Sequence, residues 1–305
     1  MKLNPLISII IPTFNDYSNL VKNIELIKKQ EFKDYEIIII NDCSTDNTEN
    51  YLSCLNDEMI SHHNLKENKG PGYARNIGIK FSKGDWISFL DSDDYWMKER
   101  LNKISNFINN NSHFELICHN EYKIDEINNI RKRFYYGPLN NLDPYKDLLM
   151  NGNRFSTSAT VVKKTFLKEN KILFNENKKY FSVEDYDFWL KCIFHNANFV
   201  FLKSFLGNYK IHENNITKNI LKHKRNYLRV IYNHVFYVQN FENNKILLWK
   251  NLYIKYNCEL AVIYLKYFKN VKKFLYLFLK CFKKNPTIVF KFIINKILPF
   301  NEYKK

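Results

Sequence analysis

The first apolar stretch of the chain reads Leu6-Ile7-Ser8-Ile9-Ile10-Ile11-Pro12-Thr13-Phe14-Asn15. A second run, Glu36–Ile40, is followed by the polar segment Asn41–Asp46, and a weaker third run covers Asp85–Leu90 before Asp91–Asp94. Apolar runs without polar alternation are typical of parallel strands that are covered on both faces. These three stretches therefore predict a buried parallel sheet whose strands end in polar residues.

Helical periodicity fills the spaces between these runs, at about residues 17–30, 46–55 and 72–82, with a weak strand pattern near 58–63. Alternating strands and helices predict an α/β fold with a doubly wound, mostly parallel sheet and right-handed connections. The elements expected further on are a helix at 97–110, a strand at 114–120, loops and one short helix (144–150) within 121–155, a helix at 185–196 and a strand pair at 199–211.

The chain has 305 residues and a formal charge of +16, and this charge is unevenly distributed. Residues 1–218 are close to neutral, whereas residues 219–305 contain 18 basic and 3 acidic side chains. We therefore expect a catalytic or binding domain at 1–218, followed by a basic helical region at 219–305 with a break at Pro286.

The basic region has the pattern of an amphipathic helix that lies on a membrane surface. Its apolar stretches are Leu260–Phe268, Phe274–Leu279 and Ile288–Leu298, and its lysines recur at intervals of four and seven residues: Lys266, Lys273, Lys280, Lys284 and Lys291. We expect peripheral contact with an anionic membrane, or packing of these helices on each other or in a homodimer. Nucleic acid is not expected as a partner, because the lysines could bind phosphates but the apolar Leu and Phe runs would not contribute to such binding.

The six cysteines lie far apart without a Cys-x-x-Cys pair, which argues against a zinc ribbon or a disulfide scaffold. No stretch approaches the ~20 apolar residues that would cross a bilayer. Pro12 interrupts the first apolar run too early for a signal peptide. The expected location is cytoplasmic, on the inner face of the membrane.

The polar residues after the strands are candidates for a ligand site, because α/β sheets bind ligands beyond the carboxyl ends of their strands. Taken singly, Asp46 could cap the next helix and Asp42 could form a turn. Asp91 and Asp93 together at one strand end would repel each other unless a cation neutralised them. Their hard oxygen atoms suit Mg²⁺ or Mn²⁺, and a diphosphate would complete such a site.

Arg75 lies in a second candidate segment, Asn68–Gly78, whose glycines allow close approach of the backbone at the start of a helix. Its guanidinium could bind a phosphate or a base, or it could form a surface salt bridge. The residue types alone leave these choices open.

Together these segments resemble the family 2 inverting glycosyltransferases, which have the GT-A fold. The matching strings are Ser8–Asn15, Ile40–Asp46, Ala74–Asn76 with Gly78, and Gly84–Asp94. Two later strings extend the resemblance: Val183–Trp189, with a Glu-Asp pair, and Tyr209–Asn215. The sequence departs from the family pattern at Asn41, where an acid is frequent, and at Lys210, where arginine is common.

The resemblance implies a role for each matched residue. Asp185 would be the general base, and Asp42 would recognise the nucleotide base. The residues implied in nucleotide-sugar binding are Pro12, Thr13, Asn15, Asp42, Arg75, Asp91 and Ser92. The residues implied in binding Mn²⁺ or Mg²⁺ are Asp93, Asp91 and His212.

The predicted function is transfer of a sugar, with inversion, from a nucleotide-diphosphate sugar such as a UDP-hexose or UDP-N-acetylhexosamine. The acceptor would be a hydroxyl of a glycan or lipid-linked saccharide in bacterial cell-surface polysaccharide or lipopolysaccharide synthesis. A nucleotidyltransferase of related topology is one alternative, although no glycine-rich, lysine-containing phosphate loop follows the first strand. A nucleic-acid-binding protein that uses the basic region is the other.

Overall fold

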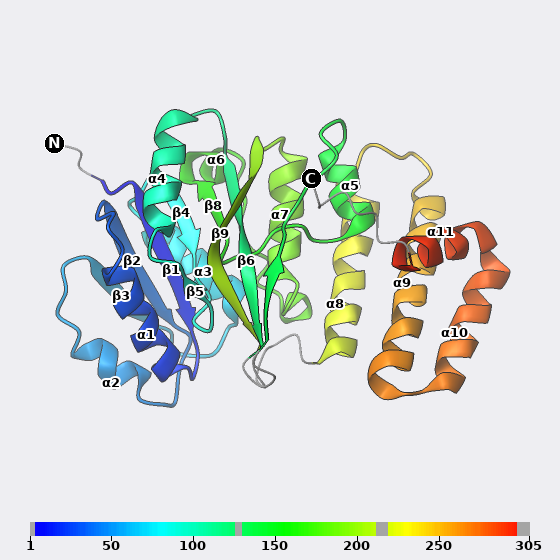
Figure 1. The fold of residues 1–305 in the computed structure, drawn as a ribbon, viewed down its shortest axis with the longest axis horizontal. Helices are drawn as coiled ribbons and strands as arrows, with labels where there is room; N and C mark the ends of the chain where they lie inside the picture. Colours follow the sequence, from blue (N-terminus) through cyan, green and yellow to red (C-terminus); the bar gives the residue numbers. More distant parts are fainter. Residues whose placement is uncertain (1–3, 126–129, 212–218, 298–305) are drawn as a thin grey trace. The chain divides into compact units, whose positions relative to one another are not determined.

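The structure is a computed structural model that describes residues 4–125, 130–211 and 219–297 (Figure 1). By its internal contacts the chain divides into two compact units, Met1–Asn219 and Ile220–Lys305. We call the first the catalytic unit, after the catalytic or binding domain expected at 1–218, and the second the helical unit.

The catalytic unit is built on one sheet with strand order β3-β2-β1-β4-β8-β6-β9-β5, and β7 pairs with β6. Its strands are β1 (Ile7–Thr13), β2 (Tyr35–Asn41), β3 (Ile60–Asn64), β4 (Trp86–Phe89), β5 (Tyr95–Trp96), β6 (Leu116–Asp125), β7 (Ile130–Phe134), β8 (Thr160–Lys163) and β9 (Phe199–Ile211). Strands β1 to β4, β6 and β9 run in one direction, and β5, β7 and β8 run in the other. The predicted α/β fold with a mostly parallel sheet is confirmed.

The described helices of this unit connect and cover the strands: α1 (Tyr17–Lys28), α2 (Thr48–Ser53), α3 (Pro71–Phe81), α4 (Arg100–Asn110), α5 (Pro144–Asn151), α6 (Lys164–Glu169), the short 3₁₀ helix η1 (Lys178–Tyr180) and α7 (Glu184–Phe194). Helix α3 begins at Pro71, and the preceding residue, Gly70, has a φ of 86°. Proline suits the first turn of a helix, and glycine adopts a positive φ without strain. Farther along α3, a Cβ at Gly78 would overlap Ile10, so this glycine lets the helix pack closely on β1.

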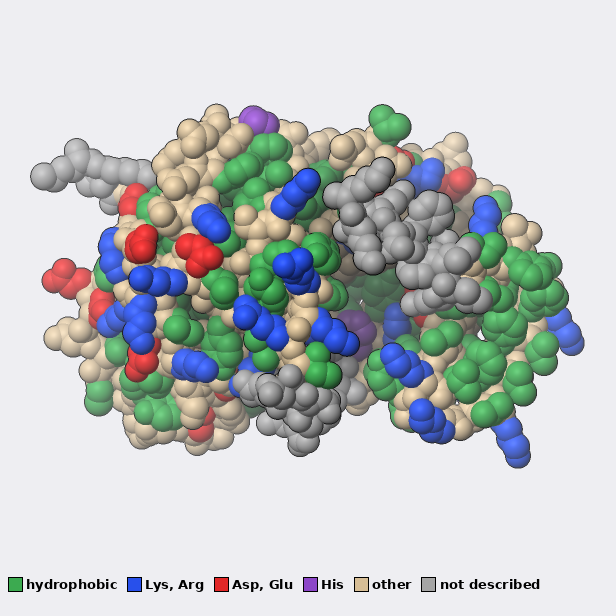
Figure 2. Space-filling view, viewed as in Figure 1, with side chains coloured by type: hydrophobic (Ala, Val, Ile, Leu, Met, Phe, Trp, Pro, Cys, Tyr) green, Lys and Arg blue, Asp and Glu red, His purple; other side chains and the backbone are tan. Residues whose placement is uncertain are grey.

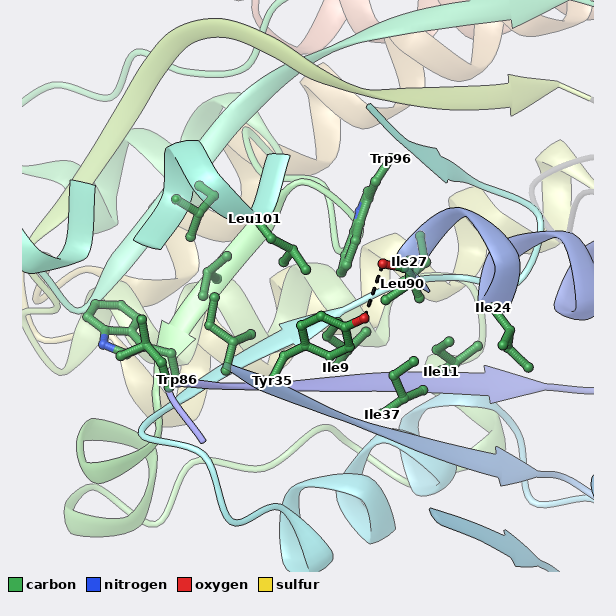
Figure 3. Packing of buried hydrophobic residues seen from close by; sticks show 14 of the residues in the cluster. Ile9, Ile11, Ile24, Ile27, Tyr35, Ile37, Trp86, Leu90, Trp96 and Leu101 are labelled. Atoms are coloured by element: carbon green, nitrogen blue, oxygen red, sulfur yellow. Dashed lines mark hydrogen bonds between the residues drawn. The ribbon is translucent and has the colours of Figure 1, made fainter. Parts of the chain in front are cut away.

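The core explains why the first strands are apolar without alternation. Ile24 and Ile27 of α1 lie in one buried cluster with Ile9 and Ile11 (Figure 3). A second cluster joins α3 to alternate positions of β2. The hydroxyl of Tyr35 donates to the carbonyl of Ile27 at 3.2 Å, which satisfies the one polar group of this tyrosine. Both faces of β1 and β2 are therefore covered, as the sequence predicted.

The helical unit contains α8 (Ile220–Asn233), a π-helical turn η3 (His234–Val238), α9 (Lys245–Phe268), α10 (Val271–Lys284) and α11 (Pro286–Ile297). The side chains of Asn244 and Asn270 cap α9 and α10 by accepting hydrogen bonds from Leu247 N and Lys273 N at 3.0 and 2.9 Å. One buried cluster of this unit consists of Ile254, Cys258, Cys281, Val289 and Phe292.

Three expectations about local structure were wrong. Residues 121–155 are not mostly irregular, because β6 continues to Asp125 and pairs with β7. Residues 199–211 form the single strand β9 rather than a pair, because β6 supplies a partner along its whole length. The basic region has breaks before Lys245 and Val271 as well as before Pro286, so it contains more helices than the two expected.

Candidate active site

The ends of β1 and β2 lie side by side, because the parallel register pairs Thr13 with Asn41. Asn15 follows with a φ of 50°, and its Oδ1 accepts a hydrogen bond from Thr45 N at 2.7 Å. The backbone N–H of Asn15 donates to Ser44 Oγ at 2.9 Å. The two loops that follow β1 and β2 therefore hold each other in place at the edge where the nucleotide was predicted.

Asn41 stands where an acid is frequent in the family, and its hydrogen bonds explain why an amide fits this position. Its Nδ2 donates to Asn64 Oδ1 on β3, and its Oδ1 accepts from Ser44 N, both at 3.0 Å. A carboxylate could make only the second of these bonds, because it has no N–H to donate.

Asp46 was expected to cap the helix that follows it; the N-cap residue of α2 is Asn47, but the side chain of Asp46 does bind the start of this helix. Its two carboxylate oxygens accept hydrogen bonds from Thr48 N and Tyr17 N, each at 3.0 Å. These are the first residues of α2 and α1, so a single carboxylate satisfies N–H groups at the starts of two helices.

Asp42 is 3% exposed, and its two carboxylate oxygens accept hydrogen bonds from Lys69 N at 2.8 Å and Gly70 N at 2.7 Å. Burial raises the pKa of Asp42, while the two backbone hydrogen bonds act in the opposite direction. The carboxylate thus fixes the segment that leads into α3. Each oxygen keeps a further lone pair, which leaves acceptor capacity for a nucleotide base.

Arg75 is the centre of a buried ionic cluster. Its guanidinium is 4% exposed and lies 2.5 Å from Asp91 Oδ1 and 2.8 Å from Glu184 Oε1. Burial alone would lower the pKa of Arg75, but the two carboxylates outweigh burial and raise it. Arg75 therefore connects α3, the loop after β4 and the start of α7, and it does not form the surface salt bridge considered above.

The loop after β4, residues 91–94, contains the carboxylates that were predicted to bind metal, and we call it the acidic loop. Asp91 and Asp93 are half-buried, and Asp94 is buried. The pKa of Asp94 is well above its usual range, because of burial first and then the negative charges of Asp93, Glu121 and Asp91. These acids are close enough to repel each other, and a divalent cation would relieve this repulsion.

Ser92 and Ser158 fix this loop in place through hydrogen bonds. Ser92 Oγ donates to Asp16 Oδ2 at 2.6 Å, beside the start of α1. Ser158 Oγ accepts from Asp91 N at 3.1 Å, and the carbonyl of Ser158 accepts from Trp96 Nε1 at 2.8 Å. Nothing in the sequence indicated that Ser158 supports this loop.

Asp185 lies in the first turn of α7, where the predicted base was placed. Burial and the adjacent charge of Glu184 raise the pKa of Asp185 to about 7, although Arg75 acts to lower it. Asn153 Nδ2 donates to Asp185 Oδ2 at 3.0 Å. Asn153 was not predicted, because it comes from the loop after α5, which carries no recognisable motif.

Only part of the predicted metal site falls within the described residues. In the described portion of the chain, no group of three or more His, Cys, Asp or Glu side chains could hold a metal ion. His212, the predicted third ligand, lies outside the described residues. Asp91 and Asp93 provide oxygen donors of the kind that Mg²⁺ and Mn²⁺ prefer, so the residues present fit a site completed by other oxygen atoms.

The family model of glycosyl transferase family 2 matches residues 8–209, a span that contains every strand-end segment described above. The chain belongs to this family. An uncharacterized glycosyltransferase of Methanocaldococcus jannaschii is 30% identical over 263 residues, which are 81% of this chain and 84% of that protein. The resemblance inferred from the motifs is thereby confirmed.

The family 2 relatives also include TarS of Staphylococcus aureus, a poly(ribitol-phosphate) beta-N-acetylglucosaminyltransferase. TarS is 31% identical over 200 residues, which are 63% of this chain and 33% of TarS. Its residues 1–349 in complex with UDP-GlcNAc match with a TM-score of 0.64 and 19% identity, over 96% of this chain and 85% of that one. A mannosyltransferase of Pyrobaculum calidifontis in complex with GDP-Man and Mn²⁺ gives a TM-score of 0.60 at 10% identity, over 99% and 83%. At these identities the solved structures show a shared fold, which agrees with the predicted GT-A type.

Proposed function

We propose that this family 2 glycosyltransferase transfers a sugar, with inversion, from a nucleotide-diphosphate sugar to a hydroxyl of a cell-surface glycan or lipid-linked acceptor. The observation that carries the proposal is the carboxyl group of Asp185. It lies at the start of α7, beside Glu184, which Arg75 joins to the acidic loop, and burial and the charge of Glu184 raise the pKa of Asp185 to about 7.

Inversion requires a base on one face of the anomeric carbon and a leaving group on the other. Asp185 would accept the proton of the acceptor hydroxyl as that oxygen forms its bond to the anomeric carbon. The bond between this carbon and the diphosphate oxygen breaks, and the nucleoside diphosphate leaves with the electron pair. A base is most effective when its pKa is near the working pH, and Asp185 meets this condition at neutral pH.

The leaving diphosphate needs its negative charge offset. Asp93 and Asp91 would hold a divalent ion, which when bound supplies positive charge to the departing oxygen. The Pyrobaculum mannosyltransferase was solved with Mn²⁺, which supports this choice of ion. Arg75 is already shared between two carboxylates, so in this account it orients Asp91 and Glu184 and adds to the positive field of the site.

The donor proposed is a UDP-hexose or UDP-N-acetylhexosamine. Asp42 would accept a hydrogen bond from the base, while Pro12, Thr13 and Asn15 would line the nucleotide at the adjacent strand end. TarS, which is 31% identical over the matched residues, was solved with UDP and UDP-GlcNAc, and this supports a uridine donor; the Pyrobaculum mannosyltransferase was solved with GDP-Man, so the guanosine donor is included in the test below.

The helical unit would hold the enzyme on an anionic membrane surface. In the described residues, no helix is long and apolar enough to span a bilayer. On α10, however, large apolar side chains are exposed beside the lysines of the same helix: Val271, Leu275, Tyr276, Leu279 and Phe282. Figure 2 shows apolar side chains on the surface of this unit, with Lys and Arg among them. Apolar burial and attraction of lysines to anionic headgroups would act together.

A vesicle flotation assay would test the membrane contact. Leu275→Ser/Leu279→Ser should reduce flotation with anionic vesicles, whereas Leu173→Ser, which changes an exposed leucine of the catalytic unit, should not. Equal flotation of all variants, or no flotation of the wild type at low salt, would assign the exposed apolar face to contact with protein instead.

The proposed reaction is tested by a panel of UDP-glucose, UDP-galactose, UDP-GlcNAc and GDP-mannose, each with Mn²⁺ or with EDTA. We expect thermal stabilisation and slow hydrolysis for at least one uridine donor, and only with the metal. NMR of the product from an α-linked donor should show a β linkage. Failure of every nucleotide sugar to bind would contradict the proposal, and an α-linked product would contradict inversion.

A further inference from the structure

The hairpin of β6 and β7 carries basic and aromatic side chains that the proposed donor site does not use. All five residues of β7 are exposed, and three of them are basic. We define the hairpin surface as Tyr122, Arg131, Arg133 and Phe205. Figure 2 shows Lys and Arg side chains gathered among hydrophobic ones over the region of β6, β7 and β9.

The arginines of this surface lie against aromatic rings. The guanidinium carbon of Arg131 is 3.8 Å from the ring centroid of Tyr122, and that of Arg133 is 5.6 Å from the centroid of Phe205. The two rings are themselves 4.9 Å apart. Stacking on rings restrains a guanidinium without using its N–H groups, so both arginines keep donors for a ligand.

Among the residues that the structure describes, neither Arg131 nor Arg133 pairs with a carboxylate; their partners are the aromatic rings. Lys123 and Lys132 are direct partners across the β6–β7 ladder, and because side chains alternate along a strand, they lie on the face of the hairpin opposite to Arg131 and Arg133. Like charges at paired positions destabilise a sheet, and they create a local field that attracts anions.

The hairpin surface adjoins the proposed donor site. Strands β6 and β9 run parallel to β1 and β4, so they end at the same edge of the sheet as the strands before Asp42 and Asp91. The ladder pairs Arg131 with Ile124 and Ile124 with Lys210. The backbone N–H of Lys210 donates to Asp94 Oδ1 at 3.2 Å, so this row of residues ends at the acidic loop.

We propose that the hairpin surface binds an acidic glycan acceptor, a saccharide chain that carries phosphate or carboxylate groups; the inference rests on the proposed glycosyl transfer. The guanidinium fork matches both anions, and aromatic rings present apolar faces to the C–H groups of sugars. A chain held along the hairpin would have its acceptor end kept at the sheet edge that carries the donor. The acceptor of the enzyme is thus a polyanion, and attraction to this surface contributes to its recognition.

The experiment measures binding apart from turnover. Fluorescently labelled oligogalacturonate, a labelled ribitol-phosphate oligomer and a neutral dextran oligomer are titrated with the full chain at low and high salt. The test variant is Arg131→Gln/Arg133→Gln. The matched control is Lys98→Gln/Lys103→Gln, which removes two exposed lysines that lie 3.8 Å from Glu31 and Glu99.

The wild type should bind at least one acidic oligomer more tightly than dextran, and salt should weaken that binding. The test variant should lose about five- to tenfold in affinity at low salt, while the control keeps the wild-type value. In transfer assays, the test variant should raise KM for an acidic acceptor and leave donor hydrolysis unchanged.

The inference is overturned if dextran binds as well as the acidic oligomers, or if the test and control variants weaken binding equally. It is also overturned if the arginines matter only for binding of anionic vesicles or single-stranded RNA. Charged residues on an edge strand can serve only to prevent aggregation, in which case the test variant would aggregate with its glycan affinity intact. Thermal stabilisation by UDP-GlcNAc with Mn²⁺ is measured on the same samples. If the donor stabilises the protein while the acidic oligomers fail to bind, only this inference fails. If the donor also fails to stabilise it, the proposed function is in question.

Discussion

Replacing Arg75 with methionine should destabilise the catalytic unit and also impair its chemistry. Removing one partner of a buried ion pair costs about 3–5 kcal/mol, because the other charge stays buried without compensation. Glu184 is 7% exposed at its side chain and would carry most of this cost, whereas Asp91 is 33% exposed and would regain water. Arg75 also lowers the pKa of Asp185, so its removal should move the acidic limb of the pH–rate profile above pH 7.

The assay is urea denaturation followed by tryptophan fluorescence, together with a pH–rate profile. In Arg75→Met/Glu184→Gln a neutral amide replaces the buried carboxylate, so about 1–3 kcal/mol of the lost stability should return. Lys103→Met serves as the control, since it removes an exposed ion pair worth at most ~1 kcal/mol. A loss below ~1 kcal/mol in Arg75→Met, with no shift in the pH profile, would refute the assignment of Arg75 as the link between the acidic loop and the base.

Three further predictions concern single carboxylates. Wild-type turnover should rise as pH increases through about 7, because the protonated Asp185 cannot accept a proton; a profile that is flat from pH 5 to 9 would contradict this. Asp42→Ala should lower the free energy of unfolding by about 1–3 kcal/mol, because Lys69 N and Gly70 N lose their acceptor, and it should weaken UDP binding in calorimetry. Asp93→Ala should abolish the stimulation of donor binding by Mn²⁺, and donor affinity that still depended on Mn²⁺ as in the wild type would exclude this residue from the metal site.

The fold was predictable where burial leaves a clear pattern. Ile9–Ile11 and Ile37–Ile40 are buried on both faces, so their composition alone indicates parallel strands. The hairpin strand Ile130–Phe134 could not be found this way. All of its side chains are exposed, and it is a strand only because β6 offers hydrogen-bond partners.

The site residues also differ in how far the sequence could predict them. Asp42, Asp91 and Asp185 could be proposed from the sequence because each belongs to a motif beside an apolar run or at a helix start. The ion pair of Arg75 with Glu184 joins residues that are 109 positions apart, and no local pattern contains such a pair. Which residues act as catalysts can therefore be proposed from motifs, but which residues hold them in position follows only from the fold.

The most direct test of the central claim compares Asp185→Asn with the wild type in turnover and in donor affinity, using the nucleotide sugar that the panel identifies. Asparagine keeps the size of the side chain and cannot accept a proton at this position. We predict that turnover falls by ~10²- to 10⁴-fold while the dissociation constant of the donor changes by less than about threefold. Turnover within a few-fold of the wild type would contradict the account, because the transferred proton would then have to go to another group.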